Sequence, residues 1–357
     1  MGSEKLPFLL VVIIQAIYAW MFILTKAALD AGLNPFVLLF YRQAIASVVL
    51  FPITVITNWR TSFNFSFKVL LKIFMLSLVG ITIGLNASHI GLELTSETVG
   101  SAAFNAIPVI TFFLAFLMRM ETLNIRKSHG IAKAAGVVLC LAGVGLIAFY
   151  MGPRIPPLNH HKLFHPKSST SGHSDSKVHS SGTWIKGTFL LLFANVAWSL
   201  WLVMQGFILE EFPSKLLLTT IQCFFSTLQS FIVAIAFERD FSKWKIGFDV
   251  RLLGVIYCAL CNAGISWYLQ AWCLQVKGPV FVAMSNPLCI LFTVISSVLI
   301  LGVPVSLGSV LGGILTIAGL YCVLWGKSRE RKILMASDEN SDNQNSEHVV
   351  IIGESLS

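Results

Sequence analysis

The chain has 357 residues, of which 55% are hydrophobic and only 12% are charged, and its mean hydropathy is +0.78. Soluble domains carry about 25% charged residues, so soluble, disordered and fibrous classes are excluded. The formal charge of +8 comes from 25 Lys and Arg against 17 Asp and Glu. These basic residues lie between apolar runs, which argues against a nucleic-acid partner and indicates a role in membrane topology.

Ten apolar runs are long enough to cross a bilayer, for which a helix needs about 20 residues. The predicted spans are 7–29, 36–57, 69–91, 97–118, 130–151, 187–209, 216–237, 252–274, 280–301 and 307–325. Strands of a transmembrane barrel would be half as long and would alternate in polarity. The sequence therefore predicts an all-α membrane protein with ten transmembrane helices.

The polar segments divide the chain. Residues 152–186 are rich in Pro, Ser, Gly and His and predict a flexible linker between residues 7–151 and 187–326, and residues 327–357 predict a disordered cytosolic tail. With the N-terminus in the cytosol, fourteen Lys and Arg lie inside, five lie in short outer loops and five in the linker, which favours this orientation. The linker histidines are irregularly spaced and the seven cysteines lie in apolar runs, so we predict no metal, disulfide or cofactor.

The two groups of five spans contain an internal repeat. A shift of 180 residues superposes rare polar and aromatic residues, in the pairs Gln15–Asn195, Tyr18–Trp198, Asp30–Glu210 and Arg42–Gln222. Because five is odd, the second copy enters the membrane from the opposite side, and the two copies form inverted repeats. Such repeats place a binding site near the midplane and open it to either side in turn. The sequence predicts two inverted five-helix repeats.

No catalytic motif such as G-x-S-x-G, H-E-x-x-H or a P-loop is present, so we predict that the protein is not an enzyme. Polar groups inside apolar spans are costly in lipid and normally face a cavity or a partner. The residues predicted to contact a substrate are Gln15, Tyr18, Arg42, Gln43, Asn105, Asn195, Trp198, Gln222, Tyr268 and Asn286.

Each of these residues also has a structural interpretation. Arg42 would attract a carboxylate, or it bonds helix carbonyls and reaches toward the surface. The amides suit a zwitterionic solute, but each alone also fits an interhelical hydrogen bond, and the aromatic residues either wall a cavity or form interfacial belts. Asn105 near Pro108, and Asn286 near Pro287, indicate either a hinge or a simple kink.

A further polar stripe lies at the outer end of the third span. His89 and Glu93 are four residues apart near its outer end. Because His titrates near neutral pH, this pair is a candidate for proton coupling. The alternative is an exposed polar cap at the membrane surface.

Four segments carry a resemblance to a known family. They are Tyr41-Arg42-Gln43, Arg119-Met120-Glu121, Gly278-Pro279-Val280-Phe281-Val282 and the stretch from Gly319 to Lys327. With them the chain, from residue 7 to about 330, resembles the plant nodulin-21-like transporters. These are also called walls-are-thin-related or usually-multiple-acids-move-in-and-out proteins, of the drug/metabolite transporter superfamily with two EamA repeats.

The resemblance implies ten helices, cytosolic termini and movement of amino acids, auxin or related metabolites across the plasma membrane or the tonoplast. One departure stands out. The family usually has a Glu after the Leu-Gly that ends the ninth helix, where this chain has Val303 and Pro304. The matching Glu121 of the first half is kept, so this chain has the acid in one half only.

These observations predict a transporter of small organic solutes, most directly amino acids, in the plasma membrane. A nucleotide-sugar or phosphometabolite exchanger would need several intramembrane cations, and Arg42 is nearly alone. A receptor or scaffold that transports nothing is the alternative of a different class, and it would tolerate substitution of Arg42 or Gln222. The expected partners are a small-molecule substrate and the lipid bilayer, with homo-oligomerisation left open.

Overall fold

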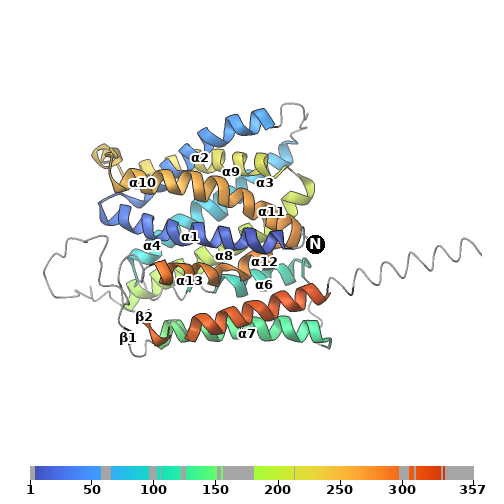
Figure 1. Cartoon of the computed structure of the whole chain (residues 1–357). Helices are drawn as coiled ribbons and strands as arrows, with labels where there is room; N and C mark the ends of the chain where they lie inside the picture. Colours follow the sequence, from blue (N-terminus) through green and yellow to red (C-terminus); the bar gives the residue numbers. More distant parts are fainter. Residues whose placement is uncertain are drawn as a thin grey trace, which may run out of the picture.

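The structure, a computed structural model, is a bundle of helices that run roughly side by side (Figure 1). The described residues are 5–57, 66–95, 103–104, 106–121, 126–150, 154–155, 181–212, 214–296, 305–308, 311–330 and 333. Asn105, predicted to contact substrate, lies outside them.

The first half contains α1 (Leu6–Asp30), α2 (Pro35–Thr57), α3 (Phe67–Leu76), η1 (Ser77–Ile83), α4 (Gly84–Glu93), α6 (Ile107–Leu117), α7 (Ser128–Phe149) and β1 (Arg154–Ile155). The second half contains α8 (Ser181–Glu211), α9 (Lys215–Phe237), η2 (Phe241–Trp244), α10 (Val250–Tyr257), η3 (Cys258–Ser266), α11 (Trp267–Lys277), α12 (Pro279–Met284), α13 (Asn286–Ser296) and β2 (Val305–Ser306). A C-terminal helix, Leu311–Glu330, follows them.

Within the described residues, seven helices are long and apolar enough to cross a membrane. Three shorter apolar helices, Ile107–Leu117, Ser128–Gly143 and Pro279–Thr293, accompany them, and all fall in order on the predicted runs. The described strands are the two-residue pair β1 and β2, in antiparallel register. The predicted class, an all-α membrane protein, is confirmed.

Several predicted boundaries differ from the structure. The predicted run 280–301 is not one helix: it breaks at Ser285 into α12 and α13, one residue before the Asn286–Pro287 pair. Because Pro287 has no backbone N–H, the helix loses a hydrogen bond at this place. α8 begins at Ser181, inside the predicted linker, and the C-terminal helix extends to Glu330, into the predicted tail.

The third and eighth spans share a distortion. η1 and η3 are π-helical, and each joins two α-helical segments of one continuous span. A shift of 183 residues places 77–83 on 260–266, which lies inside η3. The repeat therefore extends to an irregularity that hydrophobic periodicity does not mark. π-helical turns are rare and frequently lie at functional sites.

The two halves are interleaved rather than separate. α1 packs on α11 and α13 of the second half, and α8 packs on α4 and α6 of the first half. α2 and α9 pack on each other, and they also contact η3 and η1 respectively. Each contact has a counterpart in the other half: α1 on α11 corresponds to α8 on α4, and α1 on α13 corresponds to α8 on α6. This is the pattern expected of a pseudo-twofold repeat.

The bundle has two ends, which we name after the predicted topology. The inner end holds the start of α1, the end of α6 and the end of the C-terminal helix. The outer end holds the turn between α1 and α2, the β1–β2 pair and η2. In Figure 1 the N-terminus lies at the inner end, on the right, and the β1–β2 pair lies at the outer end, on the left.

Candidate transport cavity

A cavity of about 500 Å³ extends from the middle of the bundle to the outer end. Its wall is built by helices of both halves: α1, α2, α4, α6, α8, α12 and α13 contribute, together with η3 and α11. Lys26 and Asp30, near the end of α1, lie at its outer part, and Trp198, Val282 and Asn286 lie deeper. Its size falls within the range of ordinary small-molecule sites.

Arg42 supplies the deep positive charge of the cavity wall. Its side chain is buried in α2, and its guanidinium lies 5.3 Å from the centre of the Trp267 ring. Trp267 is fully buried and begins a row of indoles. The ring centres of Trp267 and Trp201 are 5.6 Å apart, and those of Trp201 and Trp198 are 4.8 Å apart. The structure shows no ion pair between Arg42 and any described carboxylate. A buried cation of this kind is a binding-site hypothesis in its own right.

Several buried polar atoms of the wall lack a hydrogen-bond partner among the described residues. Three of them are donors: Arg42 Nε, Gln270 Nε2 and Asn286 Nδ2. One, Asn262 Oδ1, is an acceptor. Because buried polar groups are nearly always paired, these four atoms in the wall are candidates for contact with a polar ligand. A wall with three such donors and one acceptor suits a solute that has a carboxylate and an N–H group.

Hydrogen bonds between α1 and the second half close the deep end of the cavity. The Tyr18 hydroxyl donates to Gln270 Oε1 at 2.9 Å. Gln15 Nε2 donates to Ser285 Oγ at 2.7 Å and to Asn286 Oδ1 at 3.3 Å. Below them the inner half is filled by a buried apolar cluster to which α1, α8, α11 and α12 contribute. The cavity is thus open toward the outer end and closed toward the inner end.

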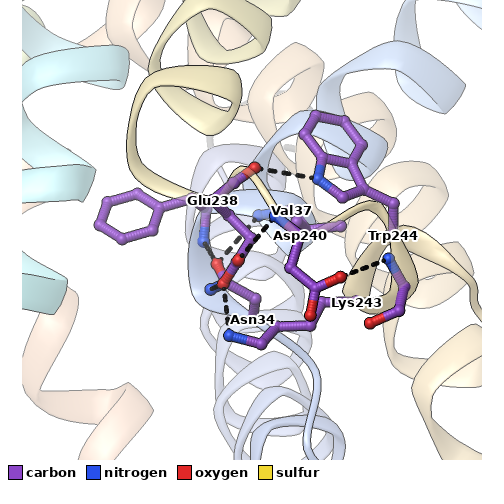
Figure 2. A network of polar contacts seen from close by, with 8 residues as sticks. Asn34, Val37, Glu238, Asp240, Lys243 and Trp244 are labelled. Atoms are coloured by element: carbon purple, nitrogen blue, oxygen red, sulfur yellow. Dashed lines mark hydrogen bonds and ion pairs between the residues drawn. The ribbon is translucent and has the colours of Figure 1, made fainter.

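A polar network at the outer end ties the start of α2 to the end of α9 (Figure 2). Asn34 Nδ2 donates to Glu238 Oε2 at 2.7 Å, and Lys243 Nζ donates to the same oxygen at 2.9 Å. Asn34 Oδ1 accepts from the backbone N–H of Phe36 at 2.9 Å and so caps α2. The hydrogen bond from Lys243 holds the pKa of Glu238 below its ordinary value.

The structure brings five predicted substrate residues into the cavity wall: Tyr18, Arg42, Asn195, Trp198 and Asn286. Gln15 lies just beneath it, through its bond to Asn286. Gln43, Gln222 and Tyr268 are not in the wall. The first two are fully buried elsewhere, whereas Tyr268 is 37% exposed. Helix periodicity explains these cases, because residues on one span share a face only at steps of three or four.

Of the two candidates for proton coupling, one lies in the cavity wall and one does not. His89 lines the cavity, whereas Glu93 is exposed and does not. The wall also contains residues absent from the predicted substrate set, among them Met21, Thr25, Ser88, Asn262 and Gln270. A sequence signal existed for the first two, because Tyr18, Met21 and Thr25 follow a helical spacing on α1.

The architecture and the cavity agree with comparisons to known proteins. The model of the EamA-like transporter family matches residues 5–149 and 185–325, one block in each half. A solved structure titled "Crystal structure of protein" aligns with a TM-score of 0.66 over 91% of this chain and 98% of its own, at 15% identity, which shows the fold alone. These matches define a multi-pass membrane transporter, a class that points away from an enzyme.

Two relatives from Arabidopsis thaliana narrow this class. The WAT1-related protein At5g64700 is 45% identical over 352 residues, 98% of this chain and 97% of the relative. The WAT1-related protein At1g43650 is 40% identical over 341 residues, 96% and 97% of the two chains. The chain belongs to the EamA-like transporter family, among its plant WAT1-related members.

Proposed function

We propose that the cavity binds a small solute with a carboxylate and an N–H donor, most directly an amino acid, and that the protein carries it across the plasma membrane by alternating access. The three donors without partners among the described residues, one of them on the cation Arg42, support binding of the carboxylate. Asn262 Oδ1 offers an acceptor for the N–H group. The tonoplast is the alternative membrane.

An auxin-like indole acid is the second candidate. Tyr18, Phe22, Phe104 and Trp198 line the cavity, and aromatic surfaces of this kind suit a planar ring. An indole acid also carries one carboxylate and one N–H, so it satisfies the same polar atoms. A phosphorylated solute is disfavoured, because Arg42 is the cation in the deep part of the wall and phosphates need several.

The interleaved packing supports a particular kind of motion. α8 moves with the first-half helices α4 and α6, and α1 moves with the second-half helices α11 and α13, because these helices pack on each other. Rocking between these two mixed groups would close the outer end and open the inner end. His89, which lines the cavity together with the titratable Asp30, is the candidate for proton coupling. If a pH gradient drives solute uptake by His89→Gln as well as by wild type, that role is excluded.

Ligand-induced thermal stabilisation tests the binding mode. Amino acids and indole acids should raise the melting temperature of the purified protein, and their amides, which lack the carboxylate, should not. Arg42→Gln should abolish this stabilisation. Gln222→Leu is the matched control, because Gln222 occupies the equivalent register of the other half outside the cavity, and it should retain the response. Equal stabilisation of Arg42→Gln by the acids would contradict the proposal.

A further inference from the structure

The inner end holds a cluster of alternating charges, two of them buried and two partly exposed, with Lys327 at 22% and Glu330 at 16%. Glu121 follows α6, Lys133 lies in α7, and Lys327 and Glu330 lie in the C-terminal helix. Glu121 accepts from both lysines, from Lys133 Nζ at 3.2 Å and from Lys327 Nζ, while Lys133 also donates to Glu330. The side chains of Lys133 and Glu121 are only 1% and 6% exposed. Two of these ion pairs join the first half of the chain to the second.

The cluster lies beside the inner seal of the cavity. α6 packs on α12, and Ala115 of α6 shares one buried apolar cluster with Val280 and Met284 of α12. Gly278, immediately before α12, has a φ of 83°, and a Cβ added there would lie 3.4 Å from Lys327 Nζ. Lys327 therefore contacts the end of α6 through Glu121 and lies against the start of α12.

We infer that Glu121 and Lys327 form a clasp that holds the inner end shut while the cavity faces outward. The inference rests on the proposed alternating access, in which α6 and α12 must separate for the inner end to open. Separation would pull Glu121 away from Lys327 and leave the buried Glu121 carboxylate with Lys133 alone among its described partners. Breaking a buried ion pair is costly for this reason, so the clasp favours the outward-facing state.

The clasp belongs to one end only. In the second half, the register of Glu121 is occupied by Val303, and a shift of 176 residues places Ser309 at the register of Lys133. The carboxylate and the lysine of the inner cluster thus have apolar or neutral counterparts in the sequence at the outer end. Because Val303 replaces the family's Glu, the closure at the outer end would lack this ion pair. The outer end should therefore open more readily than the inner end.

Thiol labelling of the purified full-length protein tests the clasp without any solute. Ala115→Cys reports opening of the inner seal, and Ser88→Cys reports access to the cavity from the outer end. Peptide-resolved mass spectrometry after maleimide treatment separates these thiols from the native ones. In the Ala115→Cys background, Glu121→Gln should raise the labelling rate about tenfold, because the neutral side chain removes the ion pair. In the Ser88→Cys background it should lower the rate.

Lys72→Gln is the matched control. Lys72 and Glu211 form an ion pair at 2.6 Å at the same end, also between the halves, but their side chains are 47% and 50% exposed. Exposed pairs contribute little, so both labelling rates should stay unchanged. Lys327→Gln should reproduce Glu121→Gln, and the double variant should exceed neither single variant. If Glu121→Gln does not fold, Lys327→Gln carries the test. If the Ala115→Cys thiol is labelled at the same rate with and without the clasp substitution, in whichever variant folds, the clasp is overturned.

The two proposals fail separately. Absence of ligand-induced stabilisation with the labelling changes intact would reject the proposed solute class but keep the clasp. Stabilisation by carboxylates without any labelling change would reject the clasp but keep the solute class.

Discussion

Arg42 is the residue on which the chemistry of the cavity depends. A charged side chain inside the membrane is costly, and this one has no described carboxylate to offset its charge. Trp267 compensates in part, because a cation over an indole face gains roughly 2 kcal/mol when both groups are desolvated. The guanidinium lies over the indole ring, and its Nε has no hydrogen-bond partner among the described residues. In the proposed function, Trp267 positions Arg42 for the ligand.

This arrangement predicts different effects for two substitutions at Trp267. Trp267→Leu removes the aromatic face and should raise the KM for a transported carboxylate about tenfold. Trp267→Phe keeps a ring and should raise the KM less. Initial rates of uptake over a concentration series measure both values. Equal KM values for the two variants would show that Trp267 only fills space.

At the scale of elements, Glu238 joins α2, α9 and η2 at the outer end. Its pKa lies below the ordinary value because Lys243 donates a hydrogen bond to it. A lowered folded pKa means that this contribution to stability is complete above the ordinary carboxyl pKa and is lost as the pH falls through the folded pKa. The outer network should therefore weaken in acid and persist at neutral pH.

Thermal unfolding in detergent measures this pH dependence. Glu238→Gln should lower the melting temperature by a few degrees at neutral pH, and its difference from wild type should shrink as the pH falls below the ordinary carboxyl pKa. Glu93→Gln serves as the control, because Glu93 is an exposed carboxylate in the outermost turn of α4. A Glu238→Gln deficit that stays constant with pH would contradict the assigned ion pair.

η1 packs closely against α8 at Gly80. A Cβ at Gly80 would overlap the Trp201 side chain, whereas a Cβ at Gly145 of α7 would meet no atom within 4 Å. Gly80→Ala should destabilise the protein by about 1–3 kcal/mol through overpacking. Gly145→Ala should leave the melting temperature unchanged or raise it, because Ala favours the helix. Similar melting temperatures for the two variants would contradict the close packing at Gly80.

Sequence patterns predicted the elements better than their contacts. Hydropathy located the spans, and superposed residues such as Gln15 and Asn195 revealed the repeat, because both signals are local or periodic. The pairs Asn34–Glu238 and Glu121–Lys327 join residues about two hundred positions apart, so no local pattern identifies them. The π-helical turns were also missed, since η1 and η3 keep the apolar composition of their spans. Among the predicted site residues, Gln43 and Gln222 lie outside the cavity wall, because composition gives polarity but not the direction of a side chain.

At the scale of the whole molecule, the interleaved halves explain why one cavity draws on so many helices. α1 crosses to the second half and α8 to the first, so each wall of the cavity contains residues of both repeats. The inner half is filled and the outer half is open, which is the arrangement that the proposed alternating access requires of an outward-facing state. The predicted motion exchanges them around Arg42, which lies between the two.

Exchange transport in proteoliposomes is the most direct measurement of solute movement by alternating access. Unlabelled amino acid inside the vesicles should accelerate uptake of labelled amino acid, because a loaded carrier returns faster than an empty one if the return step limits turnover. Uptake should saturate, and Arg42→Gln should abolish both saturation and acceleration. Uptake that rises linearly with concentration, ignores the internal solute and survives Arg42→Gln would contradict transport through this cavity.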